Sequence, residues 1–266
     1  YLESRLLPWH INYLGDVIRE NSKIRLNYDF SPVSYYYGII FFSSFFKFWL
    51  VRIFYFLIRI KPYFYLILFF MVWIFTYALK KRYFVILSVF SMGGLGIASL
   101  IISILGFEII YGYVYHKIGL MSTFFMLGLA CGSNYFNKKR YLRFDFLPYL
   151  YFIGAIYVFF LPYLFRLLEK LPIFFSGVSF IFPFLGGILV GLNFSWINAL
   201  NISKGFIKNP GTIYAFDLVG GGSWGIFLSL FLIPLYGLFI SSGIISFILL
   251  LSGILNIYYF RSVNYG

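Results

Sequence analysis

Long apolar runs alternate with short polar clusters along most of the chain, and this alternation predicts a membrane-embedded helical bundle. Each run is long enough to cross about 30 Å of hydrocarbon as a helix. Helices are expected because lipid supplies no water to free backbone groups, and because the strand-like alternation of a barrel is absent. We predict about seven spans, at residues 63–79, 83–106, 118–136, 146–167, 172–198, 212–235 and 237–259.

The N-terminal part follows a different pattern. Residues 1–34 mix charged and apolar side chains and predict a short soluble head, too small to fold alone. Residues 35–61 are rich in Phe and Tyr but carry recurrent basic side chains, which favours an interfacial amphipathic helix over a span. The expected domains are therefore 1–34, 35–61 and a bundle over 62–266. If residues 35–58 cross the membrane instead, the head moves to the other side.

Composition supports the membrane assignment. Hydrophobic residues make up 62% of the 266 and charged residues 11%, whereas a soluble domain has about 25% charged residues. Mean hydropathy is +0.89. The net charge of +13 comes from short basic clusters between apolar runs, with no continuous basic face that could follow a phosphate backbone. We therefore expect the lipid bilayer, and not nucleic acid, as a partner.

The distribution of Lys and Arg predicts the orientation, because cytoplasmic connections carry the excess of positive charge. The ten basic residues on the predicted cytoplasmic side, where the C-terminus also lies, are Lys80, Lys81, Arg82, Lys138, Lys139, Arg140, Arg143, Lys204, Lys208 and Arg261. The six on the other side are Arg52, Arg59, Lys61, Lys117, Arg166 and Lys170.

Several kinds of site are disfavoured. A lone Cys131 excludes an internal disulfide and a cysteine-based metal or iron–sulfur centre. A b-type haem needs two facing histidines, but His10 lies in the head and His116 at a span edge. Gly93-Gly-Leu-Gly96 lies within an apolar run without a following Lys, which favours helix packing over phosphate binding. We expect no catalytic residue, cofactor or metal in this chain.

Asp217 is the main candidate for function, because it lies in the predicted span 212–235. A charge in hydrocarbon is costly unless it is paired or hydrated. Three interpretations stay open: a structural acid bonded to a neighbouring helix, a proton or cation site, or a carboxylate beside a wet cavity. Its position shortly after Pro210-Gly211 favours the structural interpretation, since a helix N-terminus stabilises an anion.

Other polar residues complete a candidate intramembrane site. Glu108 and His116 lie near a membrane boundary, as ordinary interfacial groups or as a protonatable pair or quinone head-group site beside Tyr111, Tyr113 and Tyr115. Asn193 and Asn198 could bond across helices or line a polar pocket. Glycines four residues apart predict close helix packing. They are Gly128 and Gly132, Gly187 and Gly191, and Gly221 and Gly225.

Three segments resemble the spermidine synthase-like membrane proteins, in which transmembrane helices are fused to an aminopropyltransferase-like domain. Arg25-Leu-Asn-Tyr-Asp29-Phe-Ser-Pro32 resembles the N-T-D-x-x-P segment that closes the synthase-like domain, with Tyr28 replacing the usual Thr. Glu108-Ile-Ile-Tyr-Gly-Tyr, continuing to Ser133, resembles the stretch that follows such domains. Gly211–Gly225 resembles the family's G-x-x-Y-x-x-D-x-x-G-x-x-x-G helix.

The resemblance implies the tail of a synthase-like domain followed by the C-terminal membrane half, with further sequence expected upstream of Tyr1. The catalytic core would need a glycine-rich βαβ unit, which residues 1–34 do not contain. We therefore expect a non-catalytic, multi-pass module of a prokaryotic plasma (inner) membrane. It would anchor a soluble domain or a larger complex and bind another protein subunit or domain through residues 1–58. A small-solute or cation transporter is the alternative, and a quinone-site subunit of a redox complex is a weaker one.

Overall fold

The computed structural model describes residues 27–44, scattered positions between 52 and 71, and residues 81–112, 115–137, 146–169, 177–204 and 210–264. Within these ranges the chain is helical and forms no strand, which confirms the predicted all-α class. Most of the predicted head, the interfacial helix beyond residue 44 and most of the predicted span 63–79 lie outside the described residues.

The described elements are one short helix near the N-terminus and six longer ones that form the bundle. Their bounds are α2 Val33–Ser44, α5 Lys81–Tyr111, α6 Tyr115–Asn137, α7 Leu147–Leu168, α9 Ile181–Lys204, α10 Pro210–Phe227, the π-helix η2 Leu228–Leu232 and α11 Ile233–Asn264.

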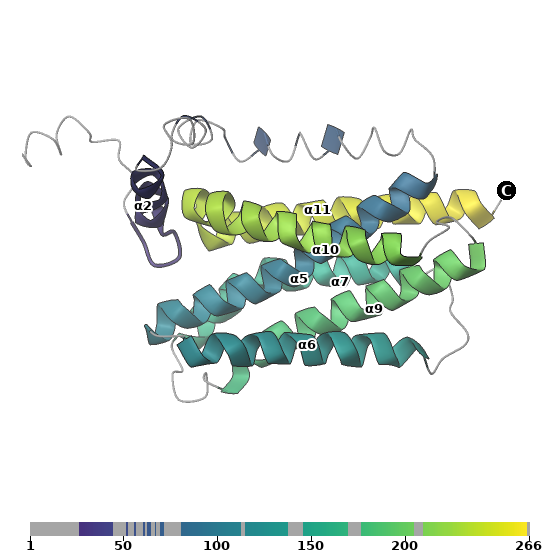
Figure 1. Ribbon diagram of the computed structural model, residues 1–266, viewed down its shortest axis with the longest axis horizontal. Coiled ribbons are helices and arrows are strands. Elements are labelled where there is room, and N and C mark those ends of the chain that lie inside the picture. The colour runs from purple at the N-terminus through teal and green to yellow at the C-terminus, as the bar shows by residue number, and fades with distance from the viewer. Residues whose placement is uncertain are drawn as a thin grey trace, which may run out of the picture.

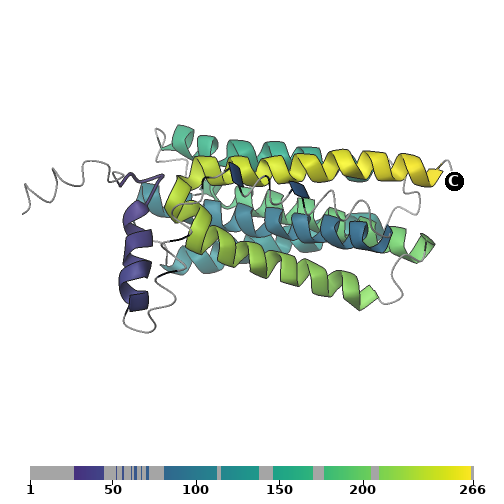
Figure 2. The ribbon, with the colours of Figure 1, turned by 90° about the horizontal axis from the view of Figure 1, so that it is seen from above.

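The long helices run along one axis of the molecule (Figure 1). Three of them, α5, α7 and α10, begin at the end where α11 finishes, which we call the C-terminal end; α6, α9 and α11 begin at the opposite end. Helix α2 lies across that opposite end, at a steep angle to the bundle (Figure 2). The helix ends that adjoin the predicted cytoplasmic Lys/Arg clusters therefore gather at the C-terminal end.

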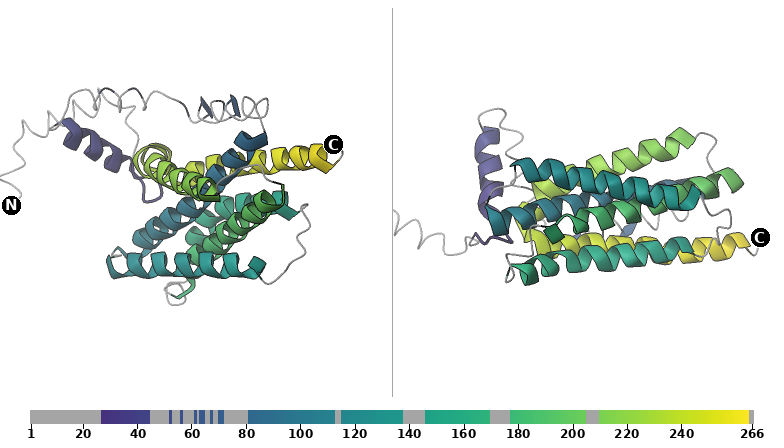
Figure 3. Two further views of the ribbon diagram at one scale, coloured as in Figure 1. Left: turned by 45° about the vertical axis from the view of Figure 1, so that its right-hand side comes forward. Right: turned by 90° about the horizontal axis from the view of Figure 1, so that it is seen from below.

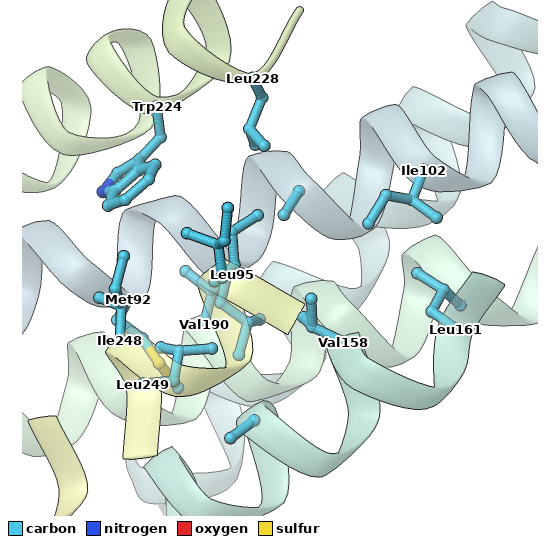
Figure 4. Packing of buried hydrophobic residues seen from close by; sticks show 14 of the residues in the cluster. Met92, Leu95, Ile102, Val158, Leu161, Val190, Trp224, Leu228, Ile248 and Leu249 are labelled. Carbon is cyan, nitrogen blue, oxygen red and sulfur yellow. The ribbon is translucent and has the colours of Figure 1, made fainter. Parts of the chain in front are cut away.

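Helix α5 is at the centre of the bundle and contacts α6, α7, α9, α10 and α11. Its residues Met92, Leu95 and Ile102 are fully buried. They belong to one hydrophobic core with Val158 of α7, Val190 of α9 and Leu249 of α11 (Figure 4). Around this core the most extensive pairings are α6 with α9, α7 with α11, and α5 with α10; Figure 3 shows α7 lying alongside α11.

Four stretches are long and apolar enough to cross a membrane: Val85–Tyr111, Leu147–Leu168, Ile181–Asn201 and Gly211–Ile257. Helix α6 is not among them, since its sequence is less apolar than those of the other long helices. The last stretch covers 47 residues, more than twice what one crossing needs. It is interrupted at Gly237, whose φ is 78° and ψ 175°. This break falls where the sequence predicts one span to end and the next to begin.

Helix α2 occupies the start of the predicted interfacial helix. It buries Val33, Tyr36 and Ile40 on one side and exposes Tyr35, Tyr37 and Phe41 on the other. The described part thus has one packed stripe and an exposed aromatic side without charged residues. Exposed aromatic rings of this kind are typical of the membrane–water interface. The basic residues that suggested amphipathicity begin at Lys47, outside this helix.

Candidate functional site

Asp217 lies on α10 where that helix crosses α5 at very short range. A Cβ placed on Gly220 would lie 2.7 Å from the carbonyl oxygen of Phe90, and one placed on Gly93 would lie 2.8 Å from the carbonyl oxygen of Asp217. Only glycine allows two backbones to approach this closely. The predicted packing residue Gly221 lies beside the crossing, and Gly225 lies a turn further, against Ile97.

The carboxylate of Asp217 is half-buried and has no hydrogen bond or ion pair within the described ranges. It lies near enough to the Tyr151 hydroxyl of α7 for the two groups to interact electrostatically. Helix α10 begins at Pro210, so Asp217 is about two turns into the helix. The field of a helix N-terminus is felt mainly in its first turn. The helix end therefore gives this carboxylate little support.

Tyr151 belongs to a buried polar network that joins three helices. Its hydroxyl donates to the carbonyl oxygen of Ser88 on α5 at 2.8 Å. The amide of Asn256 on α11 donates to Ser88 Oγ at 3.3 Å and to the carbonyl oxygen of Ser252 at 2.7 Å. All four residues are buried. We call them the Tyr151 network, and its bonds connect α5, α7 and α11 in the half of the bundle nearer the C-terminal end.

Asn193, a residue predicted from sequence, borders this network. Its side chain is 2% exposed and lies beside the Tyr151 hydroxyl. The Oδ1 atoms of Asn193 and Asn256 are both buried and receive no hydrogen bond. A buried acceptor without a donor is uncommon and calls for an explanation. Asn198 lies further along α9 and is half-buried. The structure thus brings Asn193, Tyr151 and Asp217 into one region.

Glu108 and His116 lie at the opposite end of the bundle, far from Asp217 along the helix axes (Figure 1). Both side chains are exposed. The Lys117 ammonium lies over the rings of Phe107 and Phe180, at 5.4 and 5.7 Å from their centroids. Tyr111 stacks on Phe107, whereas Tyr115 is 93% exposed. Tyr113 lies outside the described residues.

A cavity of about 590 Å³ lies at this end and brings Glu108 together with Asp29. Its walls come from residues 27–35, from the second half of α5 and from the region of η2 and early α11. Two segments singled out from sequence, around Asp29 and around Glu108, are thus neighbours in space. Two carboxylates and hydrocarbon walls in one cavity of this size suit a small molecule.

The paired glycines of α6 and α9 form a close parallel contact. A Cβ on Gly128 or Gly132 would collide with the carbonyl oxygens of Phe184 and Ile188, and one on Gly187 or Gly191 would collide with those of Phe125 and Leu129. The Ser195 hydroxyl extends the contact by donating to the carbonyl oxygen of Ser133 at 3.2 Å. Removal of side-chain bulk on both helices allows this approach. Cys131 of α6 points away from it and is exposed.

Sequence reasoning missed Ser88, Tyr151 and Asn256. Asn256 gave a usable signal, because it is a lone amide in an apolar run. Tyr151 gave none, because it is one of 25 tyrosines, and Ser88 is one of many serines that can bond within their own helix. That Asp29 and Glu108 line the same cavity depends on tertiary packing, and no local sequence pattern predicts it.

The described residues contain no group of three His, Cys, Asp or Glu side chains that could hold a metal ion. Comparison with models of protein families, with characterised proteins and with solved structures gives no significant match. The functional argument therefore depends on the geometry of the bundle.

Proposed function

We propose that this chain is the membrane module of a larger assembly: a non-catalytic, multi-pass bundle that anchors and positions a soluble domain or partner through its N-terminal segment. The observation that carries the proposal is a fixed joint between this segment and the bundle. The backbone N–H of Leu238 donates to the carbonyl oxygen of Phe30 at 2.9 Å. The turn that contains Phe30 is held against the bundle at this point.

Local structure on both sides of the joint keeps it in place. Residues 28–31 form a tight turn, in which Ser31 N–H donates to the Tyr28 carbonyl at 2.8 Å. The Asn27 side chain accepts hydrogen bonds from the backbone and hydroxyl of Ser34, at 3.0 and 2.9 Å. On the bundle side the helix breaks at Gly237, which leaves the next N–H free to meet Phe30. A connection of this kind suits an anchor that orients the soluble domain or partner attached to it.

The outer face of α10 supports a place in a larger complex. Tyr214, Leu218, Val219 and Ile226 are exposed there, and a Cβ on Gly222 would meet no atom within 4 Å. A face that combines apolar side chains with a bare glycine is the kind of surface on which a further membrane helix packs.

The number of crossings, the orientation and the family relationship belong to the same proposal. About seven crossings, with the C-terminus in the cytoplasm of a prokaryotic cell, agree with six long helices whose adjoining Lys/Arg clusters gather at one end. The module would be the membrane half of a spermidine synthase-like protein. The turn that holds α2, from Asn27 to Pro32, is the segment that resembles the end of a synthase-like domain.

Native mass spectrometry of the tagged full chain, extracted from membranes in mild detergent, tests the proposal. We expect a stoichiometric second component, lost when residues 1–26 are deleted while the bundle keeps its helical circular dichroism. The contact should bury at least about 1,000 Å². A monodisperse single chain, with residues 1–58 ordered and touching only themselves, would contradict the proposal.

A transporter of a small solute or cation is the second candidate. It is favoured by the unsatisfied Oδ1 atoms of Asn193 and Asn256 near the Asp217 carboxylate. These acceptors could face a transported cation in a conformation more open than this one. The site would not include Glu108, which lies at the other end of the bundle. For a quinone site, the exposed Tyr115 and the Phe107-stacked Tyr111 offer no support.

A further inference from the structure

An irregular stretch of helix forms one wall of the cavity that contains Asp29 and Glu108. The chain winds as a π-helix over Leu228–Leu232, and Ile233 N–H bonds to the Leu228 carbonyl. Pro234 has no N–H to continue the ladder, and Gly237 then ends the regular helix. This irregular stretch leaves space between itself, α5 and the turn at residues 28–31. π-Helical turns of this kind are frequent at functional sites.

Most of the cavity wall is hydrocarbon. On α5 the side chains of Ile101, Ile104 and Leu105 line it, and Ile233 and Leu238 face them from the other side. The α5 residues recur every three or four positions, so they form one stripe along the helix. A fully hydrated small ion would leave this surface wet, which is unfavourable. The wall therefore selects a ligand that has an apolar part.

The same stripe ends at a carboxylate. Glu108 follows Ile104 and Leu105 by one turn of α5, and Asp29 lies across from it on the 28–31 turn. Neither carboxylate forms an ion pair with another described residue. Lys117, the Lys or Arg residue nearest to Glu108 in the described sequence, lies over two phenyl rings. The lining thus contains two anionic groups and no basic residue.

We propose that the cavity binds an amphiphile with a positively charged amine head and a hydrocarbon tail. The head would lie between Asp29 and Glu108, where the rings of Tyr28 and Tyr35 can also contact a cation. The tail would lie along Ile101–Leu105. An anionic head would meet two like charges, and a bare divalent ion would leave the hydrocarbon wall of the cavity without a partner. The inference does not depend on the anchoring role.

Photolabelling of the full chain in phosphatidylcholine nanodiscs tests this site. The probe is dodecylamine with a diazirine in its chain. We expect labelled peptides from residues 27–35, 101–109 and 233–238, and protection by unlabelled dodecylamine but not by dodecyl sulfate. Asp29→Asn with Glu108→Gln should lower labelling by about tenfold, the effect of losing roughly one charged hydrogen bond. Glu169→Gln, an exposed carboxylate at the same end outside the cavity, should leave labelling unchanged.

A second variant keeps the test decisive if the double substitution unfolds the protein. Leu105→Trp fills the apolar half while retaining both carboxylates, and it should also abolish labelling. Adding phosphatidylethanolamine to the nanodisc distinguishes the source of the amine: protection indicates a lipid head group, and no protection indicates a free alkylamine. Labelling spread evenly along the bundle, or displaced equally by dodecyl sulfate, would overturn the proposal.

Discussion

The backbone N–H of Leu238 and the carbonyl oxygen of Phe30 are 2.9 Å apart and join the N-terminal segment to the last helix of the bundle. The bond exists because the helix is broken at the preceding residue, Gly237. A Cβ at that position would lie 2.7 Å from the Phe30 oxygen. The break, the close approach and the hydrogen bond therefore depend on one glycine.

Gly237→Ala should loosen this joint. Alanine is strained at a φ of 78° and also meets Phe30, so we expect a loss of about 1–3 kcal/mol in the free energy of unfolding. Protease cleavage within residues 27–44 should accelerate, and thermal unfolding in nanodiscs should occur at lower temperature. Gly243→Ala is the matched control, because it lies in the same helix with no atom within 4 Å. Equal behaviour of the two variants would show that the joint has no structural role.

Gly132→Ala should separate α6 from α9. The added methyl group would collide with the Ile188 carbonyl, and overpacking of this kind costs about 1–3 kcal/mol. Gly119→Ala, on the same helix in open space, should instead be neutral or slightly stabilising, since Ala is the better helix former by about 0.5–1 kcal/mol. Thermal unfolding of both variants in the same lipid measures the difference. The same sign of effect for both variants would refute the proposed close contact.

Topology can be read with a reporter fused after Gly266. The excess of Lys and Arg near the helix ends at the C-terminal end predicts a cytoplasmic location. A C-terminal fluorescent protein that folds only in the cytoplasm should be bright, and an alkaline phosphatase fusion should be inactive. The opposite pair of results would place the cavity of Asp29 and Glu108 on the cytoplasmic side.

The fold follows from sequence as far as it depends on local pattern. Apolar runs and their polar boundaries locate the described long helices, and Gly237 marks a break that the sequence anticipates. The sequence also singles out Gly128, Gly132, Gly187 and Gly191. It does not predict that the two pairs face each other. Membrane helices are apolar on every side, so hydrophobicity gives no information about which faces meet.

The candidate sites were harder to predict for the same reason. Asp217 and Asn193 stand out as polar residues in apolar runs, whereas Tyr151 and Ser88 do not differ from the many other tyrosines and serines. Glu108 and Asp217 belong to one predicted site by chemistry, but helix direction places them at opposite ends. The cavity needs a π-helix, a break and a docked turn at once, and no single segment encodes that combination.

The central claim is that the bundle is a support and not a pathway, and Asp217→Asn tests it most directly. An amide keeps an acceptor oxygen and removes a costly charge, so the support account predicts unchanged or higher stability. Asp217→Leu removes the acceptor as well and should weaken the contact of α10 with its neighbouring helices by on the order of 1 kcal/mol or less. The measurement is proton and monovalent-cation flux into proteoliposomes of the wild-type chain and the folded Asn variant. We predict no flux above that of empty liposomes for either; a wild-type flux that the Asn variant abolishes would contradict the account.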